Sequence, residues 1–351
     1  MRYLVAALLL LDLATVQARA QVFEHINLDH LNGKLQGRVV DFTKNHGADR
    51  RINSAILGMP RDLYVYLPPG YDPSQAYPLI IFLHGADIDE HALLDPHVFK
   101  ALDWMICQGE IPRVVIAAPD GTYDGENRIS STHSLWVNGR GGRFEDHVVS
   151  EVLPFMVRTF SIRPEREAHA TVGISAGGFG AMSIAMKHRD LFGAVATIAA
   201  PLNVRYDTVS GRYSDDFEPA TYRERTEYDP DLIIARFYLG LVRRRVKKFI
   251  EPVYGSGPDV IAAIARDNPA DLLITTGLQP GELALYVNYP GRDNYNFDAQ
   301  DQSFAWLAAQ RGIVVDLAES PSGRHNLPYI ERAMPLAFLW LGRHLLPPTP
   351  R

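Results

Sequence analysis

Short apolar runs that alternate with helix-length segments constrain the fold of this chain more than any other feature of its sequence. The apolar runs cover residues 79–83, 114–118, 170–173, 194–199, 283–289 and 313–317. Segments in which apolar residues recur at helical spacing lie between or after them, at residues 99–108, 146–159, 178–188, 297–311 and 330–345. Runs that are apolar on both faces are typical of strands buried in a parallel sheet. The alternation therefore predicts an α/β fold with a mostly parallel central sheet flanked by helices on both sides.

Residues 203–280 interrupt this alternation. The segment is rich in Tyr, Arg and Asp and shows no regular succession of strand and helix. At 351 residues, the chain is long enough for one large domain or for two ordinary ones. Because no linker-like composition, low-complexity tract or internal repeat divides it, we expect a single domain over residues 21–351. Residues 203–280 would then be an insertion or cap before the last strands.

The first 20 residues have the composition of a secretory signal peptide. Arg2 precedes an apolar run over residues 3–11, and small residues stand on both sides of Arg19. This pattern predicts export, with cleavage after Ala20 and a secreted or periplasmic mature protein. The alternative is an N-terminal membrane anchor, but the run is much shorter than the roughly 20 apolar residues that a spanning helix needs. No later apolar segment reaches that length, so we expect no stable membrane insertion.

Charge and cysteine content exclude several classes of partner and site. The formal net charge is −6, from 35 basic and 41 acidic residues, which gives no electrostatic basis for binding nucleic acid. The single cysteine, Cys107, allows neither an intrachain disulfide nor a cysteine-based metal cluster. Residues 243–248, Arg-Arg-Arg-Val-Lys-Lys, form the one basic cluster, which we interpret as the solvated face of a helix rather than as an anion site.

Residues 173–177, Gly-Ile-Ser-Ala-Gly, carry the strongest chemical signal in the sequence. They match the pattern Gly-x-Ser-x-Gly and stand where a predicted strand ends and a predicted helix begins. In this context a sharp turn lifts the serine hydroxyl above the sheet, and the flanking glycines remove side chains that would collide with the strand and helix. The N–H groups at the start of the helix favour developing negative charge. We therefore predict that Ser175 is a nucleophile rather than part of a plain glycine-rich turn.

A nucleophilic serine needs a general base and a group that orients the base. His325 follows the last predicted strand and precedes the last helix, where hydrolases of the order Ser, acid, His place their base. Asp293 follows the strand at residues 283–289 and is the preferred acid, although its position also suits a helix N-cap. Asp298, in the first turn of the next helix, and Asp207, after the preceding strand, remain alternatives.

Acyl transfer also requires N–H donors for the oxyanion of the tetrahedral intermediate. The backbone N–H of Ala176, next to the nucleophile, is one expected donor. The other should come from the loop after the strand at residues 79–83, where Ala86 follows His84 and Gly85. Both donors are inferred from position alone, because a backbone N–H leaves no side-chain signature.

These residues resemble a known family, the esterases of the α/β-hydrolase superfamily, which include S-formylglutathione hydrolase, feruloyl and siderophore esterases, and mycobacterial mycolyltransferases. The resemblance extends over about residues 57–345, and its motifs are Val-Tyr-Leu-Pro-Pro-Gly-Tyr at 65–71, Phe-Leu-His-Gly at 82–85, Ser-Ala-Gly-Gly-Phe-Gly-Ala-Met at 175–182 and Gly-Arg-His at 323–325. It implies the α/β-hydrolase fold, with Ser175 as nucleophile, Asp293 as acid, His325 as base, and Ala86 and Ala176 as oxyanion donors. The chain departs from many relatives at Ala176, where they have Met, and at Asn326, where they have Asp.

The residues and the resemblance together predict an exported serine esterase that hydrolyses carboxylic esters through an acyl-enzyme on Ser175. This mechanism requires neither a metal nor an organic cofactor. The expected substrates are small-molecule esters or esters linked to polysaccharide, the latter by analogy at the level of the fold. Two alternatives stay open. An acyltransferase would use the same residues and pass the acyl group to a sugar, and a binding protein would keep the fold without the chemistry.

Overall fold

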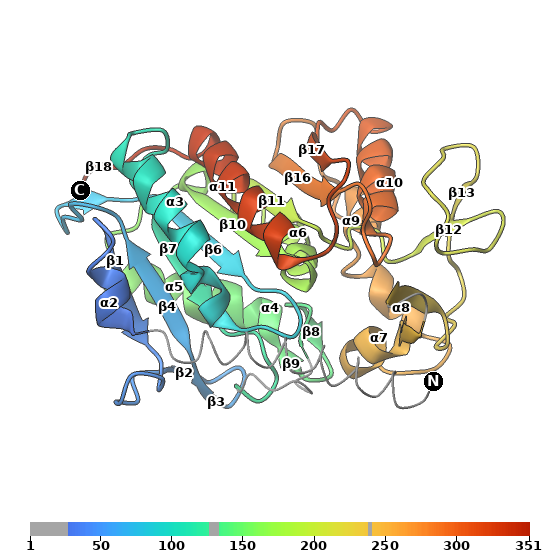
Figure 1. Cartoon of the computed structure of the whole chain (residues 1–351), viewed down its shortest axis with the longest axis horizontal. Helices are drawn as coiled ribbons and strands as arrows, with labels where there is room; N and C mark the ends of the chain where they lie inside the picture. Colours follow the sequence, from blue (N-terminus) through green and yellow to red (C-terminus); the bar gives the residue numbers. More distant parts are fainter. Residues whose placement is uncertain (1–26, 126–132, 238–240) are drawn as a thin grey trace.

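An eight-stranded sheet forms the centre of the computed structural model, which describes residues 27–125, 133–237 and 241–351 (Figure 1). The spatial order is β1 (Arg38–Phe42), β4 (Leu63–Leu67), β7 (Val115–Pro119), β6 (Leu79–Leu83), β10 (His169–Ile174), β11 (Ala194–Ile198), β16 (Ala284–Pro290) and β17 (Asp316–Ser320). β4 is antiparallel to both of its neighbours, whereas from β7 to β17 every neighbouring pair is parallel. The sheet confirms the predicted fold class. The predicted signal peptide, residues 1–20, lies outside the described residues.

Alternate residues of the buried strands supply two hydrophobic cores, one on each face of the sheet. In β6, Leu79 and Ile81 enter one core, and Ile80 and Phe82 enter the other. The first core is covered by α5 (Leu153–Thr159), α6 (Ala176–Lys187), α9 (Pro269–Thr275) and α10 (Phe297–Ala309). The second is covered by α3 (Pro96–Cys107) and α11 (Leu327–His344), which pack against each other. Burial on both faces explains why these strands are apolar at successive positions.

Two predicted elements differ in detail from the observed ones. The helix predicted at residues 146–159 consists of α4 (Phe144–His147), a π-helical turn over Val148–Val152, and α5. The last predicted strand, residues 313–317, is wrong as a buried strand. β17 begins only at Asp316 and lies at the edge of the sheet, so Leu317 is 47% exposed, while Ile313 packs into the core before the strand starts. The apolar run there combines a core contact of the preceding loop with the start of an edge strand.

In its described part, the segment of residues 203–280 forms two β-hairpins followed by three helices. The hairpins are β12 (Tyr206–Thr208) with β13 (Tyr222–Glu224), and β14 (Ile233–Phe237) with β15 (Val242–Arg245). The helices are α7 (Lys247–Tyr254), α8 (Val260–Ala265) and α9. α9 packs against α6 and α10 and so belongs to the helical layer. Figure 1 shows α7 and α8 at the end of the molecule that carries β16 and β17.

The basic cluster has a different local structure from the one expected. Arg243, Arg244 and Arg245 pair with β14 and are part of a strand, so the interpretation as a helix face is wrong for them. Lys247 and Lys248 alone begin a helix, α7. Three consecutive arginines gave no alternating pattern from which a strand could have been predicted.

Short elements complete the described chain. They are α2 (Leu28–Asn32), β2 (Ile52–Ser54), β3 (Met59–Arg61), β5 (Gln75–Ala76), β8 (Asn138–Gly139), β9 (Gly142–Arg143), β18 (Thr349–Pro350) and the 3-10 turns Glu90–Leu94 and Arg166–Ala168. β18 pairs with β5, which ties the C-terminal residues to the body of the fold. Among the residues described, no helix has the length and apolar character needed to cross a bilayer.

Candidate active site

Ser175 occupies a strained turn between β10 and α6. The strand ends at Ile174, the helix begins at Ala176, and the serine between them has φ 52° and ψ −120°. A positive φ is uncommon for a residue with a side chain and is found mainly where the surrounding structure enforces it. Here the N–H of Ser175 donates to the carbonyl of Ile198 in the adjacent strand β11, at 2.8 Å. The turn therefore fixes the serine at the carboxyl edge of the sheet, as the motif predicts.

The two glycines of the motif make this turn possible. A Cβ atom on Gly177 would overlap the backbone carbonyl of Leu83 at the end of β6, and one on Gly173 would overlap the backbone of Gly177. Strand and helix thus approach each other more closely than any other residue type would permit. The same close approach brings the loop after β6 against Ser175, since a Cβ on Gly85 would lie only 3.4 Å from Cβ of Ser175.

The structure brings together the serine, histidine and aspartate that the sequence singled out. His325 lies in the loop between β17 and α11, and its Nε2 is 3.1 Å from Oγ of Ser175. Its Nδ1 is 2.9 Å from Oδ2 of Asp293, which follows β16 and has a fully buried side chain. An ionised carboxylate only accepts hydrogen bonds, so Nδ1 carries the proton and Nε2 is free to accept the serine proton. The other oxygen of Asp293 accepts from the N–H of Tyr295 at 2.7 Å.

The two alternative acids have other surroundings. Asp207 lies in β12 and pairs with Arg223 at 2.9 Å and Arg225 at 3.1 Å. Asp298 lies in the first turn of α10, and burial, followed by the negative charge of Asp293, raises its pKa to about 6. Of the three candidate acids in the described chain, Asp293 is the one hydrogen-bonded to His325.

Two aromatic rings that the sequence analysis did not identify enclose the histidine. Tyr295 and Phe297 meet the His325 ring edge to face, with centroid distances of 5.1 Å and 5.4 Å. Tyr295 follows Asp293 in the loop after β16, and Phe297 is the first residue of α10, so one short segment supplies the carboxylate and both rings that contact the imidazole. The signal available in the sequence was a pair of aromatic residues at alternate positions after the candidate acid. The sequence does not show in which direction the chain runs there, so the contact of these rings with His325 could not be deduced.

Ala86 and Ala176 line the same cavity as Ser175 and His325. Ala176 is the first residue of α6, where backbone N–H groups have no partner within the helix. Ala86 lies in the loop after β6 that packs against the serine. Both predicted donors are therefore on the backbone segments nearest to the serine hydroxyl, where negative charge would develop in acyl transfer.

His84 fixes the direction of the peptide that contains the N–H of Ala86. The N–H of Gly121 donates to Nε2 of His84 at 2.8 Å, so the ring proton is on Nδ1 and is donated to the carbonyl of Gly85 at 2.9 Å. In a trans peptide the carbonyl and the following N–H point in opposite directions. Because this hydrogen bond holds the Gly85 carbonyl toward the buried imidazole, the N–H of Ala86 points away from the imidazole. We infer that His84 is a positioning residue for that donor.

Replacing His84 tests this role. We expect His84→Leu to lower kcat for ester hydrolysis by about 10- to 100-fold with little change in KM, because an oxyanion donor acts mainly in the transition state. His84→Asn keeps an amide N–H that can reach the Gly85 carbonyl and should recover most of the rate. Steady-state kinetics on a p-nitrophenyl ester measure both variants. Equal losses in the two variants, or a loss confined to KM, would contradict the positioning role.

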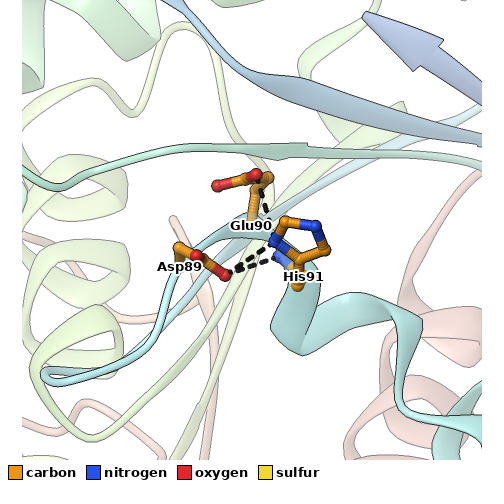
Figure 2. Close-up of side chains that lie close together, drawn as sticks. All are labelled: Asp89, Glu90 and His91. Atoms are coloured by element: carbon orange, nitrogen blue, oxygen red, sulfur yellow. Dashed lines mark hydrogen bonds and ion pairs between the residues drawn. The ribbon is translucent and has the colours of Figure 1, made fainter. Parts of the chain in front are cut away.

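A buried group of titratable side chains lies farther along the same loop. Asp89, Glu90 and His91 each place a ligand-type atom within 4.8 Å of the others (Figure 2). Nδ1 of His91 is 3.0 Å from Asp89 and 3.3 Å from Glu90, while its Nε2 is 3.2 Å from Tyr64 Oη and from Asn45 Nδ2. Both ring nitrogens thus already have protein partners. We interpret the group as a hydrogen-bond network that anchors the loop to β4 rather than as a metal site.

Asp62, near this network, should make stability depend on pH. Burial, followed by the negative charge of Asp120, raises the pKa of Asp62 from 3.8 to about 6. Stability linked to this group is therefore complete below about pH 4 and is lost as the pH rises through about 6. Asp62→Asn keeps an acceptor for the N–H of Lys44, so we expect it to raise the free energy of unfolding by about 2 kcal/mol at pH 8 and to have little effect at pH 4. Urea denaturation at both pH values measures this, and a gain independent of pH would refute it.

A cavity of about 220 Å³ opens onto Ser175 and His325 and is predominantly apolar. The body of the fold contributes Leu135, Phe179, Pro201, Tyr295 and Phe297 to its wall. Residues 203–280 contribute Val204, Leu232, Ile234, Val246, Phe249 and Ile250. The segment that interrupts the α/β alternation therefore forms much of the wall around the candidate nucleophile. The sequence analysis located the segment but not the side chains that face the cavity.

A protein-family profile with the description "Putative esterase" matches residues 54–252, more than half of the chain. The chain belongs to this esterase family. Among curated proteins, an esterase of Mycobacterium tuberculosis is 27% identical over 164 residues, which are 45% of this chain and 33% of that protein. The endo-1,4-beta-xylanase Y of Acetivibrio thermocellus is 28% identical over 145 residues, 39% of this chain and 12% of that protein. The chain thus spans a third or less of the length of these relatives.

Solved structures share the fold of this esterase-family chain over most of its length. A ferulic acid esterase aligns with a TM-score of 0.59 and 18% identity, covering 88% of this chain and 98% of that one. The S-formylglutathione hydrolase of Agrobacterium tumefaciens aligns with a TM-score of 0.60 and 14% identity, covering 89% and 97%. MPT51 of Mycobacterium tuberculosis aligns at 0.56 and 13%, covering 84% and 97%. At such identities these similarities confirm the predicted α/β-hydrolase fold, whereas the match to the family profile confirms the family expected from the sequence motifs.

Proposed function

We propose that this chain is a serine esterase that cleaves carboxylic esters through an acyl-enzyme on Ser175. The observation that carries the proposal is the hydrogen-bonded series from Asp293 through His325 to Ser175 at the mouth of one cavity. Membership in the esterase family supports the same class of reaction. A series of this kind activates a hydroxyl that is otherwise a weak nucleophile.

The proposed reaction proceeds in two acyl transfers. Oγ of Ser175 attacks the ester carbonyl while Nε2 of His325 takes the hydroxyl proton, and Asp293 stabilises the imidazolium and holds its tautomer. The N–H groups of Ala86 and Ala176 stabilise the oxyanion. The carbon–oxygen bond to the alcohol then breaks, and the alcohol leaves with the proton from His325. Water, deprotonated by the same nitrogen, attacks the acyl-enzyme and releases the acid and Ser175.

The acyl part of the substrate is proposed to occupy the apolar cavity, whose wall offers aliphatic and aromatic contacts. Polysaccharide-linked esters belong to the proposal as one source of substrate, supported by the similarity of this chain to a ferulic acid esterase and to a xylanase. Export is proposed from the sequence of the first 20 residues. An exported enzyme would meet its esters outside the cytoplasm.

Hydrolysis of p-nitrophenyl acetate and butyrate by the purified protein tests the proposed reaction. Esterase function predicts release of p-nitrophenol together with one equivalent of free acid. Product analysis in the presence of a sugar acceptor separates the alternatives. Transfer of the acyl group to the sugar in preference to water would establish an acyltransferase, and folded protein that releases no p-nitrophenol from either ester would favour a binding protein.

A further inference from the structure

The β14–β15 hairpin and the start of α7 concentrate positive charge beside the cavity. Residues 232–250 contain six Arg and Lys and no Asp or Glu, in a chain whose formal net charge is −6. The six residues are Arg236, Arg243, Arg244, Arg245, Lys247 and Lys248, and we call them the cationic hairpin. No part of the reaction proposed above uses these charges.

Most of these charges are not neutralised within the protein. Arg236 lies directly opposite Arg243 in the hairpin register, and both side chains are exposed. Asp231 pairs with Lys247 at 2.9 Å and with Arg245 at 3.6 Å, but among the described residues no ion pair occurs to the other four cations, Arg236, Arg243, Arg244 and Lys248. Like charges that face each other across two strands destabilise the pair. The surface is thus complementary to an anionic partner.

The same hairpin also presents apolar side chains. Leu232, Ile234 and Val246 line the cavity next to Ser175. Leu241, just before β15, is 46% exposed. The ring of Phe237 packs against the Tyr295 ring beside His325, with a distance of 5.7 Å between ring centroids. Residues 238–240, between the two strands in sequence, are outside the described part of the chain. The hairpin is therefore amphipathic: some of its apolar side chains line the cavity, and the side chains of Arg236, Arg243, Arg245 and Lys248 are exposed.

Cationic and exposed apolar side chains together favour a lipid surface over a soluble polyanion. Basic residues are attracted to anionic headgroups. Exposed apolar side chains are stabilised on a membrane only if they enter the boundary between the headgroups and the acyl chains. A hydrated acidic polymer would neutralise the arginines but would provide no apolar environment in which the Leu241 side chain could be buried. We propose that the cationic hairpin docks the enzyme on an anionic lipid surface, from which an ester substrate enters the apolar cavity with its acyl part. The substrate half of this proposal rests on the proposed esterase function.

Vesicle binding by the full chain tests the docking separately from the chemistry. Vesicles of phosphatidylcholine with about 30% phosphatidylglycerol should co-sediment the protein at low salt, and pure phosphatidylcholine vesicles should not. Charge reversal of Arg243, Arg245 and Lys248 to Glu should weaken binding by at least about 100-fold, taking about 1 kcal/mol per basic residue. The matched control reverses three exposed cations elsewhere, Lys34, Lys100 and Arg311, and should bind as the unmodified protein does.

Four further results keep the proposal falsifiable. The hairpin variant should retain hydrolysis of soluble p-nitrophenyl acetate, which shows that it folds, and should lose hydrolysis of a p-nitrophenyl ester of a long-chain acid carried in anionic vesicles. Leu241→Ser should weaken vesicle binding and leave binding to polygalacturonate unchanged. The docking would be overturned if the wild-type protein failed to bind anionic vesicles at low salt or bound both vesicle types equally. Binding that 0.5 M salt does not weaken would also overturn it. Tighter binding to polygalacturonate than to vesicles would replace the lipid surface with an acidic polymer.

Failure of the docking and failure of the esterase function give different results. Ser175→Ala should bind anionic vesicles as the unmodified protein does, because the serine is not on the cationic hairpin. A protein that binds vesicles but hydrolyses neither soluble nor embedded esters would contradict the esterase proposal and leave the docking in place. A protein that hydrolyses soluble esters but binds no vesicle would do the reverse.

Discussion

Ser175→Ala is expected to lower kcat for ester hydrolysis by about 10⁵- to 10⁶-fold, the scale of loss when a triad nucleophile is removed. The loss follows from the geometry, since Oγ of Ser175 is the atom hydrogen-bonded to Nε2 of His325. Alanine lacks the hydroxyl but keeps the turn and the hydrogen bond that the backbone N–H of residue 175 donates to the carbonyl of Ile198. Steady-state kinetics on p-nitrophenyl butyrate, with a circular-dichroism melt to confirm folding, measure the effect.

A second serine of the same helix supplies the control for this variant. Ser183 lies in α6, is fully buried, and has no hydrogen-bond partner for its hydroxyl among the described residues. Ser183→Ala removes the same atom without touching the site, so its activity should stay within about twofold of the unmodified protein. Activity that survives in Ser175→Ala would place the nucleophile elsewhere and would remove the basis of the proposed mechanism.

Asp293→Asn should have the second-largest effect, a loss of about 10⁴-fold in kcat. The carboxylate accepts the Nδ1 proton of His325 at 2.9 Å, which leaves Nε2 unprotonated and able to take the serine proton. An asparagine can present its NH₂ group to Nδ1, which moves the imidazole proton to Nε2 and abolishes the base. The asparagine is nearly isosteric, so folding is expected to be retained.

The alternative acids provide the comparison that decides the assignment. Asp298→Asn should change kcat by less than about tenfold, because Asp298 interacts with the charge and the backbone of Asp293 but is not hydrogen-bonded to His325. Asp207→Asn disturbs the pairs with Arg223 and Arg225, and its effect should be on stability rather than on kcat. A larger kcat loss in Asp298→Asn or Asp207→Asn than in Asp293→Asn would assign the acid differently.

The sheet and the position of the serine could be predicted from sequence because both depend on local patterns. Strands buried on both faces are apolar throughout, and a sharp strand-to-helix turn needs glycine where Gly173 and Gly177 stand. Such patterns are readable without knowing what packs against them. The same reasoning placed His325 and Asp293 at one edge of the sheet, since each follows a predicted parallel strand.

The remainder depends on contacts between distant parts of the chain. Sequence position favoured Asp293 as the acid but left Asp207 and Asp298 open as alternatives, and the side-chain hydrogen bonds in the fold distinguish the three. The residues of segment 203–280 that line the cavity come from separate stretches of the sequence, so they could not be predicted to face it. The helix predicted at Arg243 to Arg245 is wrong because β15 pairs, within the described chain, with its hairpin partner β14 alone, and such a strand of partly buried and exposed residues needs no apolar alternation.

The most direct test of the account is to locate the residue that reacts with a fluorophosphonate. An activated serine attacks the phosphorus, a P–O bond forms, and fluoride leaves, so the adduct marks the nucleophile itself. Tryptic peptide mass spectrometry should find one stoichiometric adduct, on Ser175, with none in the Ser175→Ala protein and little in His325→Ala. An adduct on another residue, or folded protein that remains unlabelled, would contradict the assignment of Ser175 as the nucleophile.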